Sequence, residues 1–103
     1  MNVLSARLQV IHSADPGAQG RVYALGGDEV SLGREATSTI VIATEQASRQ
    51  HARIVLVGEA HVLQDLGSTN GTFVNSKPVT EQRLQPGDVL RIASTVMKYL
   101  VEP

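Results

Sequence analysis

The chain contains no cysteine and no tryptophan, and its aromatic residues are limited to Tyr23, Phe73 and Tyr99. Without cysteine, disulfide bonds, zinc–thiolate sites and cysteine nucleophiles are all excluded. With so few rings, the chain also lacks the stacking platforms on which proteins that bind single-stranded nucleic acid depend. Its core must therefore be packed from aliphatic side chains, whose β-branched members favour strands.

The chain also has almost no excess of positive or negative charge. Nine lysine and arginine residues against ten aspartate and glutamate residues give a formal net charge of -1. This balance predicts neither nucleic acid nor an anionic membrane surface as a partner. No stretch approaches the roughly 18 apolar residues of a membrane span, and residues 1–15 lack the regions of a secretion signal. We therefore expect a cytoplasmic protein.

The 103 residues provide room for one domain, which we expect to span residues 1–103. The apolar pattern has a short period, and no window shows helical spacing. We predict strands at residues 6–12, 21–25, 29–34, 40–43, 51–57, 61–66, 72–75, 89–93 and 96–102, with turns between them that include residues 76–78. Short strands at this spacing predict an all-β fold, a two-sheet antiparallel β-sandwich of about ten or eleven strands.

Three loops contain more polar and charged side chains than a simple turn requires. The first of them begins at the end of the third predicted strand. Gly33 permits a bend or a close backbone approach that a side chain would block. Arg34 projects from the strand end with five donors, a geometry that suits phosphate or carboxylate. The alternative is an ordinary solvated arginine beside Glu35.

The second loop carries a hydroxyl, a guanidinium and an imidazole between Ser48 and His51. One interpretation is a nucleophilic serine with a histidine base, but no acid is placed to orient the imidazole. A second interpretation makes His51 a brace that hydrogen-bonds the loop backbone and leaves Ser48 and Arg49 facing solvent. A third is a loop with one partly buried histidine. Catalysis is the weakest of the three.

The third loop, residues 66–72, contains Asn70-Gly71 between two predicted strands, which is a strong signal for a β-hairpin. A minimal hairpin would not need the preceding Gly-Ser-Thr. The loop is therefore longer and richer in hydroxyl and amide groups than a turn requires. The side chain of Asn70 offers both a donor and an acceptor, which suits binding to a peptide backbone.

Taken together, the order and spacing of these loops resemble the forkhead-associated (FHA) domain family. Ser48-x-x-His51 begins fifteen residues after Gly33, and Asn70 lies nineteen residues after His51. The resemblance extends from about residue 8 to residue 101, and the segment LGSTNGTFVN at 66–75 fits especially closely. It implies an eleven-stranded β-sandwich that recognises phosphothreonine-containing peptides through loops at one end.

Carried over position by position, the resemblance implies a phosphopeptide-binding site made of five residues. Arg34 would contact the phosphate, and Ser48 would donate its hydroxyl to a phosphate oxygen. Arg49 would add a second charged contact. Thr69 and Asn70 would lie beside the threonine and hold the main chain of the ligand.

The resemblance assigns Gly33, His51 and Gly71 to the support of this site, as a bend, a brace and a turn. It implies a phosphothreonine-containing protein or peptide as the partner, and no cofactor. Since FHA domains often adjoin catalytic or signalling domains, other domains of a larger parent protein are further expected neighbours.

Two other functions compete with this interpretation. The main alternative is an FHA fold that acts as an interaction or dimerisation module without phosphate. An enzyme is disfavoured, because the carboxylates are scattered and no Gly-rich phosphate loop is present. The histidines His12, His51 and His61 lack the spacing of metal ligands, so we expect no metal site.

Overall fold

The computed structural model describes residues 5–102, and in them the chain forms eleven strands. These are β1 (Ala6–His12), β2 (Val22–Leu25), β3 (Val30–Gly33), β4 (Ile40–Val41), β5 (Ala52–Val57), β6 (Ala60–Asp65), β7 (Thr72–Val74), β8 (Lys77–Val79), β9 (Glu81–Arg83), β10 (Val89–Ile92) and β11 (Thr95–Val101). Within this part of the chain, no helix is long and apolar enough to cross a membrane.

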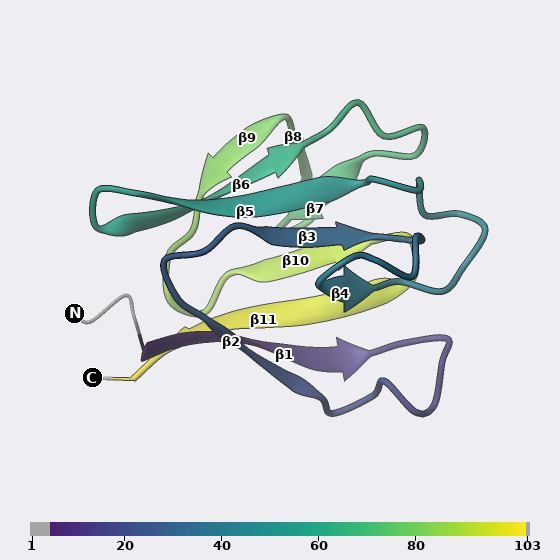
Figure 1. The fold of residues 1–103 in the computed structure, drawn as a ribbon, viewed down its shortest axis with the longest axis horizontal. Helices are drawn as coiled ribbons and strands as arrows, with labels where there is room; N and C mark the ends of the chain where they lie inside the picture. The colour runs from purple at the N-terminus through teal and green to yellow at the C-terminus, as the bar shows by residue number, and fades with distance from the viewer. Residues whose placement is uncertain (1–4, 103) are drawn as a thin grey trace.

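The strands form two sheets that enclose a common core (Figure 1). The six-stranded sheet has the order β2-β1-β11-β10-β7-β8, and the five-stranded sheet has the order β4-β3-β5-β6-β9. The predicted all-β, two-sheet sandwich is therefore confirmed.

Alternation along the strands builds the core. In β1, Ala6, Leu8 and Val10 are buried, while the residues between them are partly exposed. The antiparallel neighbour β11 buries Met97 and Tyr99 in the same way. The buried hydrophobic residues are almost all aliphatic, as the scarcity of aromatics requires.

A buried polar contact between His61 and Tyr99 crosses this core. The ring of His61, 2% exposed, donates from Nε2 to the carbonyl of Gly26 over 2.9 Å, because a carbonyl can only accept. Its Nδ1 then accepts the hydroxyl of Tyr99 over 2.8 Å. The contact joins the five-stranded sheet to the six-stranded sheet and leaves no polar atom of either ring unpaired.

The expectation of a wholly antiparallel arrangement is wrong at one pair. Strand β4 runs parallel to β3, with Leu32 opposite Ile40 and Gly33 opposite Val41. Two parallel strands are usually joined by a long crossover. Here only two residues of each strand pair, so the short loop at residues 34–39 is long enough to return the chain to the start of β4. β4 ends at Val41, two residues earlier than predicted, and the N–H of Ile42 then donates to the carbonyl of Gly33 over 2.8 Å.

Two strands were not predicted, and the turn expected at residues 76–78 is wrong. The turn lies at Asn75 and Ser76, whose φ angles of 50° and 70° match the left-handed pair of a tight hairpin. Pro78 lies within β8, where it is tolerated because β8 forms the edge of its sheet. The sequence of β9 is entirely polar and carries no alternation that could reveal a strand.

The contact across the core yields a prediction about stability. Tyr99→Phe removes the donor to Nδ1 of His61 and leaves a buried acceptor unpaired, which costs about 1–3 kcal/mol. We expect the free energy of unfolding in urea to fall by that amount, while the fold is retained. A variant as stable as the original protein would show that this hydrogen bond contributes nothing.

Candidate functional site

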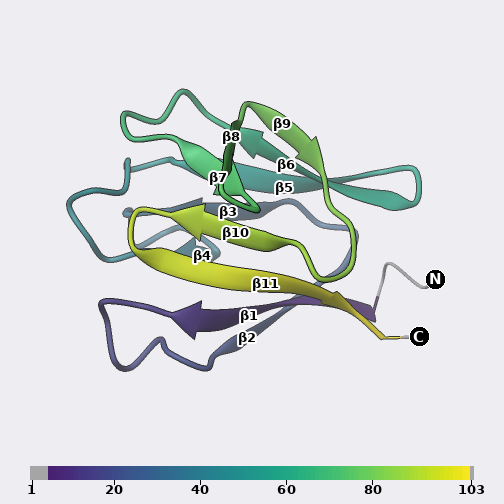
Figure 2. The ribbon, with the colours of Figure 1, turned by 180° about the vertical axis from the view of Figure 1, so that it is seen from behind.

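Three loops converge at one end of the sandwich, at the right in Figure 1 and at the left in Figure 2, while the start of β1 and the end of β11 lie at the opposite end. They are residues 34–39 after β3, residues 42–51 before β5, and residues 66–71 between β6 and β7. The three segments that attracted attention in the sequence are thus neighbours in space.

Gly33 brings the first two loops together. A Cβ atom on Gly33 would lie 2.2 Å from the carbonyl oxygen of Arg49 and 3.1 Å from the nitrogen of His51, so only glycine fits there. The adjoining N–H of Arg34 donates to the carbonyl of Ser48 over 3.0 Å. The side chain of Arg34 is exposed, and within residues 5–102 it forms no ion pair.

His51 joins the second loop to the third. Its ring is fully buried, and Nδ1 accepts the backbone N–H of Ser48 over 3.0 Å. Nδ1 therefore carries no proton, and Nε2 donates to the carbonyl of Gly71 over 2.9 Å. These contacts are those of a brace between two backbones. They leave the ring no free nitrogen to act as a base for the Ser48 hydroxyl.

The hydroxyl of Ser48 lies between the same two loops. Its oxygen accepts the N–H of Thr69 over 3.1 Å, which leaves the hydroxyl proton available to a ligand. Asn70 spans the gap beside it, because Nδ2 donates to the carbonyl of Gln46 over 2.8 Å. No donor in the described part of the chain bonds the side-chain oxygen of Asn70, so this oxygen can accept from a ligand.

The hairpin interpretation of Asn70-Gly71 is wrong. Strand β6 belongs to the five-stranded sheet and β7 to the six-stranded sheet, so the loop between them crosses from one sheet to the other. Gly71, with φ of 87°, makes the bend that starts the crossing into β7.

The carboxylate of Asp65 holds this crossing loop and was missed in the sequence. It accepts the N–H groups of Gly67 and Ser68 over 3.0 and 3.1 Å and the hydroxyls of Ser68 and Thr72 over 2.5 and 2.7 Å. Partial burial raises the pKa of Asp65, but these hydrogen bonds outweigh it and hold the pKa below the usual 3.8. An aspartate followed two and three residues later by glycine and serine is the signal that could have revealed it.

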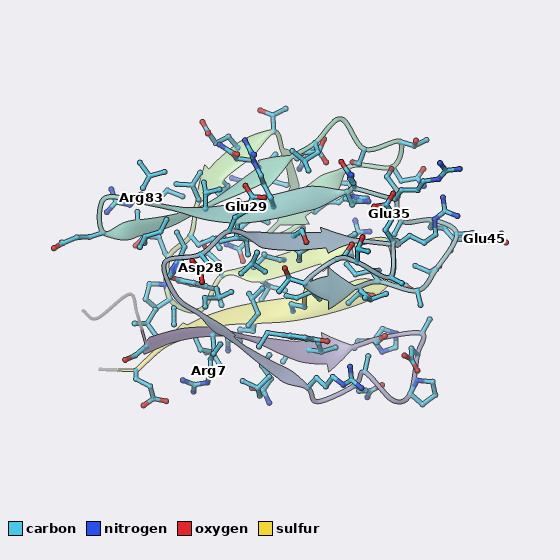
Figure 3. The ribbon with its side chains drawn as sticks, viewed as in Figure 1. Arg7, Asp28, Glu29, Glu35, Glu45 and Arg83 are labelled. Carbon is cyan, nitrogen blue, oxygen red and sulfur yellow. The ribbon has the colours of Figure 1, made fainter. Side chains whose placement is uncertain are left out.

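The loops enclose a hollow of about 400 Å³, which is lined by Arg34, Glu45, Gln46, Ala47, Ser48, Arg49, Gln50, Thr69 and Asn70. All five predicted ligand-contacting residues are among them. Two guanidinium groups, two hydroxyls and three amide side chains outnumber the single carboxylate, that of Glu45 at the tip of its loop (Figure 3). The guanidinium groups of Arg34 and Arg49 have no acidic partner among the described residues. This arrangement can bind an anion that has several oxygens.

Within residues 5–102, no group of three or more histidine, aspartate or glutamate side chains is placed to hold a metal ion.

This fold and these loops match a known family. The family model for the FHA domain matches residues 30–93. FhaB of Mycolicibacterium smegmatis is 38% identical over 80 residues, which cover 77% of this chain and 52% of FhaB. An FHA domain from a study of phosphothreonine-dependent interactions superposes with a TM-score of 0.83 at 35% identity, covering 96% of this chain and 98% of that one. Mycobacterium tuberculosis EmbR, solved with a low-affinity phosphopeptide, gives a TM-score of 0.84 at 32% identity over 94% of this chain and 24% of EmbR.

The chain belongs to the FHA domain family, which consists of binding modules rather than enzymes. It spans about half the length of FhaB and a smaller part of EmbR.

The close approach at Gly33 yields a second prediction. Gly33→Ala forces a Cβ atom into the carbonyl of Arg49, so the strand and the loop must separate. We expect the free energy of unfolding to fall by about 2 kcal/mol or more. Gly26→Ala is the matched control, because a Cβ there meets nothing within 4 Å. Equal stability of the two variants would contradict the argument.

The lowered pKa of Asp65 yields a third prediction. Asp65→Asn places amide donors opposite N–H groups and should cost about 1–3 kcal/mol near neutral pH. The carboxylate stabilises the fold fully above its unfolded-state pKa, and that contribution is lost as the pH falls through the lower folded-state pKa. Urea titrations of both proteins should therefore show a difference that is largest near neutrality and shrinks below about pH 4. A difference independent of pH would contradict this account.

Proposed function

We propose that this chain is a phosphopeptide-binding module that recognises phosphothreonine in partner proteins through the hollow at the loop end of the sandwich. One observation carries the proposal: Arg34, Arg49 and the hydroxyl of Ser48 line one hollow, and no acidic side chain of the described residues neutralises the two guanidinium groups. A phosphothreonine supplies about -1.5 to -2 charges and three acceptor oxygens, which such a site satisfies.

Each lining residue then has a distinct role. Arg34 and Arg49 bind the phosphate oxygens, and Ser48 donates the hydroxyl proton that its contact with Thr69 leaves available. Asn70 offers its side-chain oxygen to an N–H of the peptide backbone. Thr69 lies beside the phosphothreonine. The residues Gly33, His51 and Gly71 keep the loops in register and do not contact the ligand.

The expected affinity follows from the number of charged contacts. Hydrogen bonds to charged groups contribute roughly 1.5–3 kcal/mol each. After the cost of association, a few of them together with backbone contacts are consistent with micromolar binding, about 8 kcal/mol. From the family we expect phosphothreonine to be preferred to phosphoserine, through a small pocket for the γ-methyl group.

The relatives support this assignment. EmbR was solved with a phosphopeptide, and another relative comes from a study of phosphothreonine-dependent interactions. For this chain we propose a phosphothreonine-containing protein as the partner, one module over residues 1–103, and a cytoplasmic location. The alternative remains a module that binds its partner without phosphate.

Titration with matched peptides tests the proposal. A library of phosphothreonine peptides should bind, while the same peptides without phosphate should not. Arg34→Ala and Ser48→Ala should each weaken phosphopeptide binding about tenfold or more, because each removes a hydrogen bond to a charged group. Isothermal titration calorimetry measures the affinities, and thermal denaturation checks that the variants are folded.

The matched control is Arg83→Ala, which removes an exposed arginine at the other end of the molecule (Figure 3). It should bind like the original protein. Equal binding of phosphorylated and unphosphorylated peptides would reject the proposal and favour the phosphate-independent module.

A further inference from the structure

A second hollow adjoins the phosphate hollow, on the outer face of the five-stranded sheet. It has a volume of about 200 Å³ and is lined by Glu29, Ser31, Leu32, Glu35, Thr37, Ser38, Gln50, Ala52, Arg53 and Leu66. Figure 3 labels its two carboxylates, Glu29 and Glu35. None of the proposed phosphate-binding residues lines it, so it is unexplained by the function proposed above.

The charge of this hollow is negative once its internal pairs are counted. Arg53 is already engaged, because its guanidinium donates to Glu29 over 3.2 Å and to the side-chain oxygen of Gln64 over 2.7 Å. Among the described residues, Glu35 forms no ion pair and accepts no side-chain hydrogen bond. Its carboxylate is therefore the uncompensated charge of the lining.

The backbone holds Glu35 in place. Its N–H donates to the carbonyl of Arg49 over 3.2 Å, and its carbonyl accepts the N–H of Ser38 over 3.0 Å. The far end of the same loop is tied to the sheet, because the N–H of Thr39 donates to the hydroxyl of Ser31 over 2.8 Å and the N–H of Ser31 donates to the hydroxyl of Thr39 over 3.1 Å. The hollow is thus formed before any ligand arrives.

One exposed aliphatic side chain borders the hollow. Leu66 is 41% exposed, whereas the side chains of Leu32 and Ala52 belong to the core and alternate with Ser31 and Arg53 on the outer face. An uncompensated carboxylate beside an exposed leucine suits a ligand that has a long apolar stem and a cationic end. Lysine and arginine side chains have this form.

The two hollows are neighbours along the same loops. Gln50 lines both of them, and Arg34 and Glu35 are consecutive residues, of which the first faces the phosphate hollow and the second this one. We propose that the second hollow binds a lysine or arginine side chain of the same phosphopeptide, a few residues from the phosphothreonine. The module then selects a peptide in which an anion and a cation stand at a set spacing. This inference rests on the function proposed above.

A lysine walk tests the inference on the intact protein. A single lysine is moved through each position flanking the phosphothreonine in a peptide that is otherwise alanine and serine, and the affinity of each peptide is measured by fluorescence anisotropy. We expect one position, or two adjacent ones, to strengthen binding about threefold to fivefold. Glutamate at the same position should weaken binding.

Glu35→Gln should remove that preference, so that the peptides with and without lysine bind this variant equally, and Glu35→Lys should reverse it in favour of glutamate. Glu59→Gln is the matched control, because it makes the same change of charge in the exposed turn between β5 and β6, at the far end of the sandwich. It should retain the preference for lysine.

The outcomes separate the two proposals. If phosphopeptides bind but the lysine walk is flat, or if its preference survives in Glu35→Gln, the second hollow is not a cation site and the phosphopeptide function stands. If no phosphopeptide binds, both proposals fall. If the preference is present in the original protein and in Glu59→Gln but absent in Glu35→Gln, the inference is supported.

Discussion

The site depends on one buried side chain. The ring of His51 accepts the N–H of Ser48 and donates to the carbonyl of Gly71, twenty residues further along the chain, and so links the second loop to the third. Both nitrogens are used and the ring is fully buried, so neither loop can move without leaving a buried polar atom unpaired. A site assembled in this way needs little ordering when its ligand binds, which lowers the entropic cost of association.

The proposed specificity depends on where charges lie rather than on how many there are. The chain as a whole is nearly neutral, with a formal net charge of -1. At the loop end, two guanidinium groups without acidic partners among the described residues share one hollow, and the carboxylate of Glu35 belongs to the next. Opposite charges that are separate but adjacent suit a ligand with the complementary pattern, and they leave no broad basic surface to attract other polyanions.

Much of the fold was predictable, because alternation in strands such as β1 and β11 is a local property that follows from burying one face of a sheet. The strands β8 and β9 escaped prediction, since one contains Pro78 and the other has no apolar residue. Their pairing depends on neighbours from distant parts of the chain. Asp65 was missed for a related reason: its importance lies in four donors that gather around it only once the loop is folded.

The sequence by itself determined the class of fold, the absence of cysteine chemistry and the identity of the groups available at the loops, because composition, periodicity and turn residues are local properties. Only the tertiary structure decided that the loop containing Asn70 crosses between sheets instead of forming a hairpin, and that Gly33 presses against the backbone of Arg49. It also decided that Glu35 and Leu66 line one hollow beside the guanidinium groups. These features arise from the packing of two sheets, which sets the distances between residues that no local pattern relates.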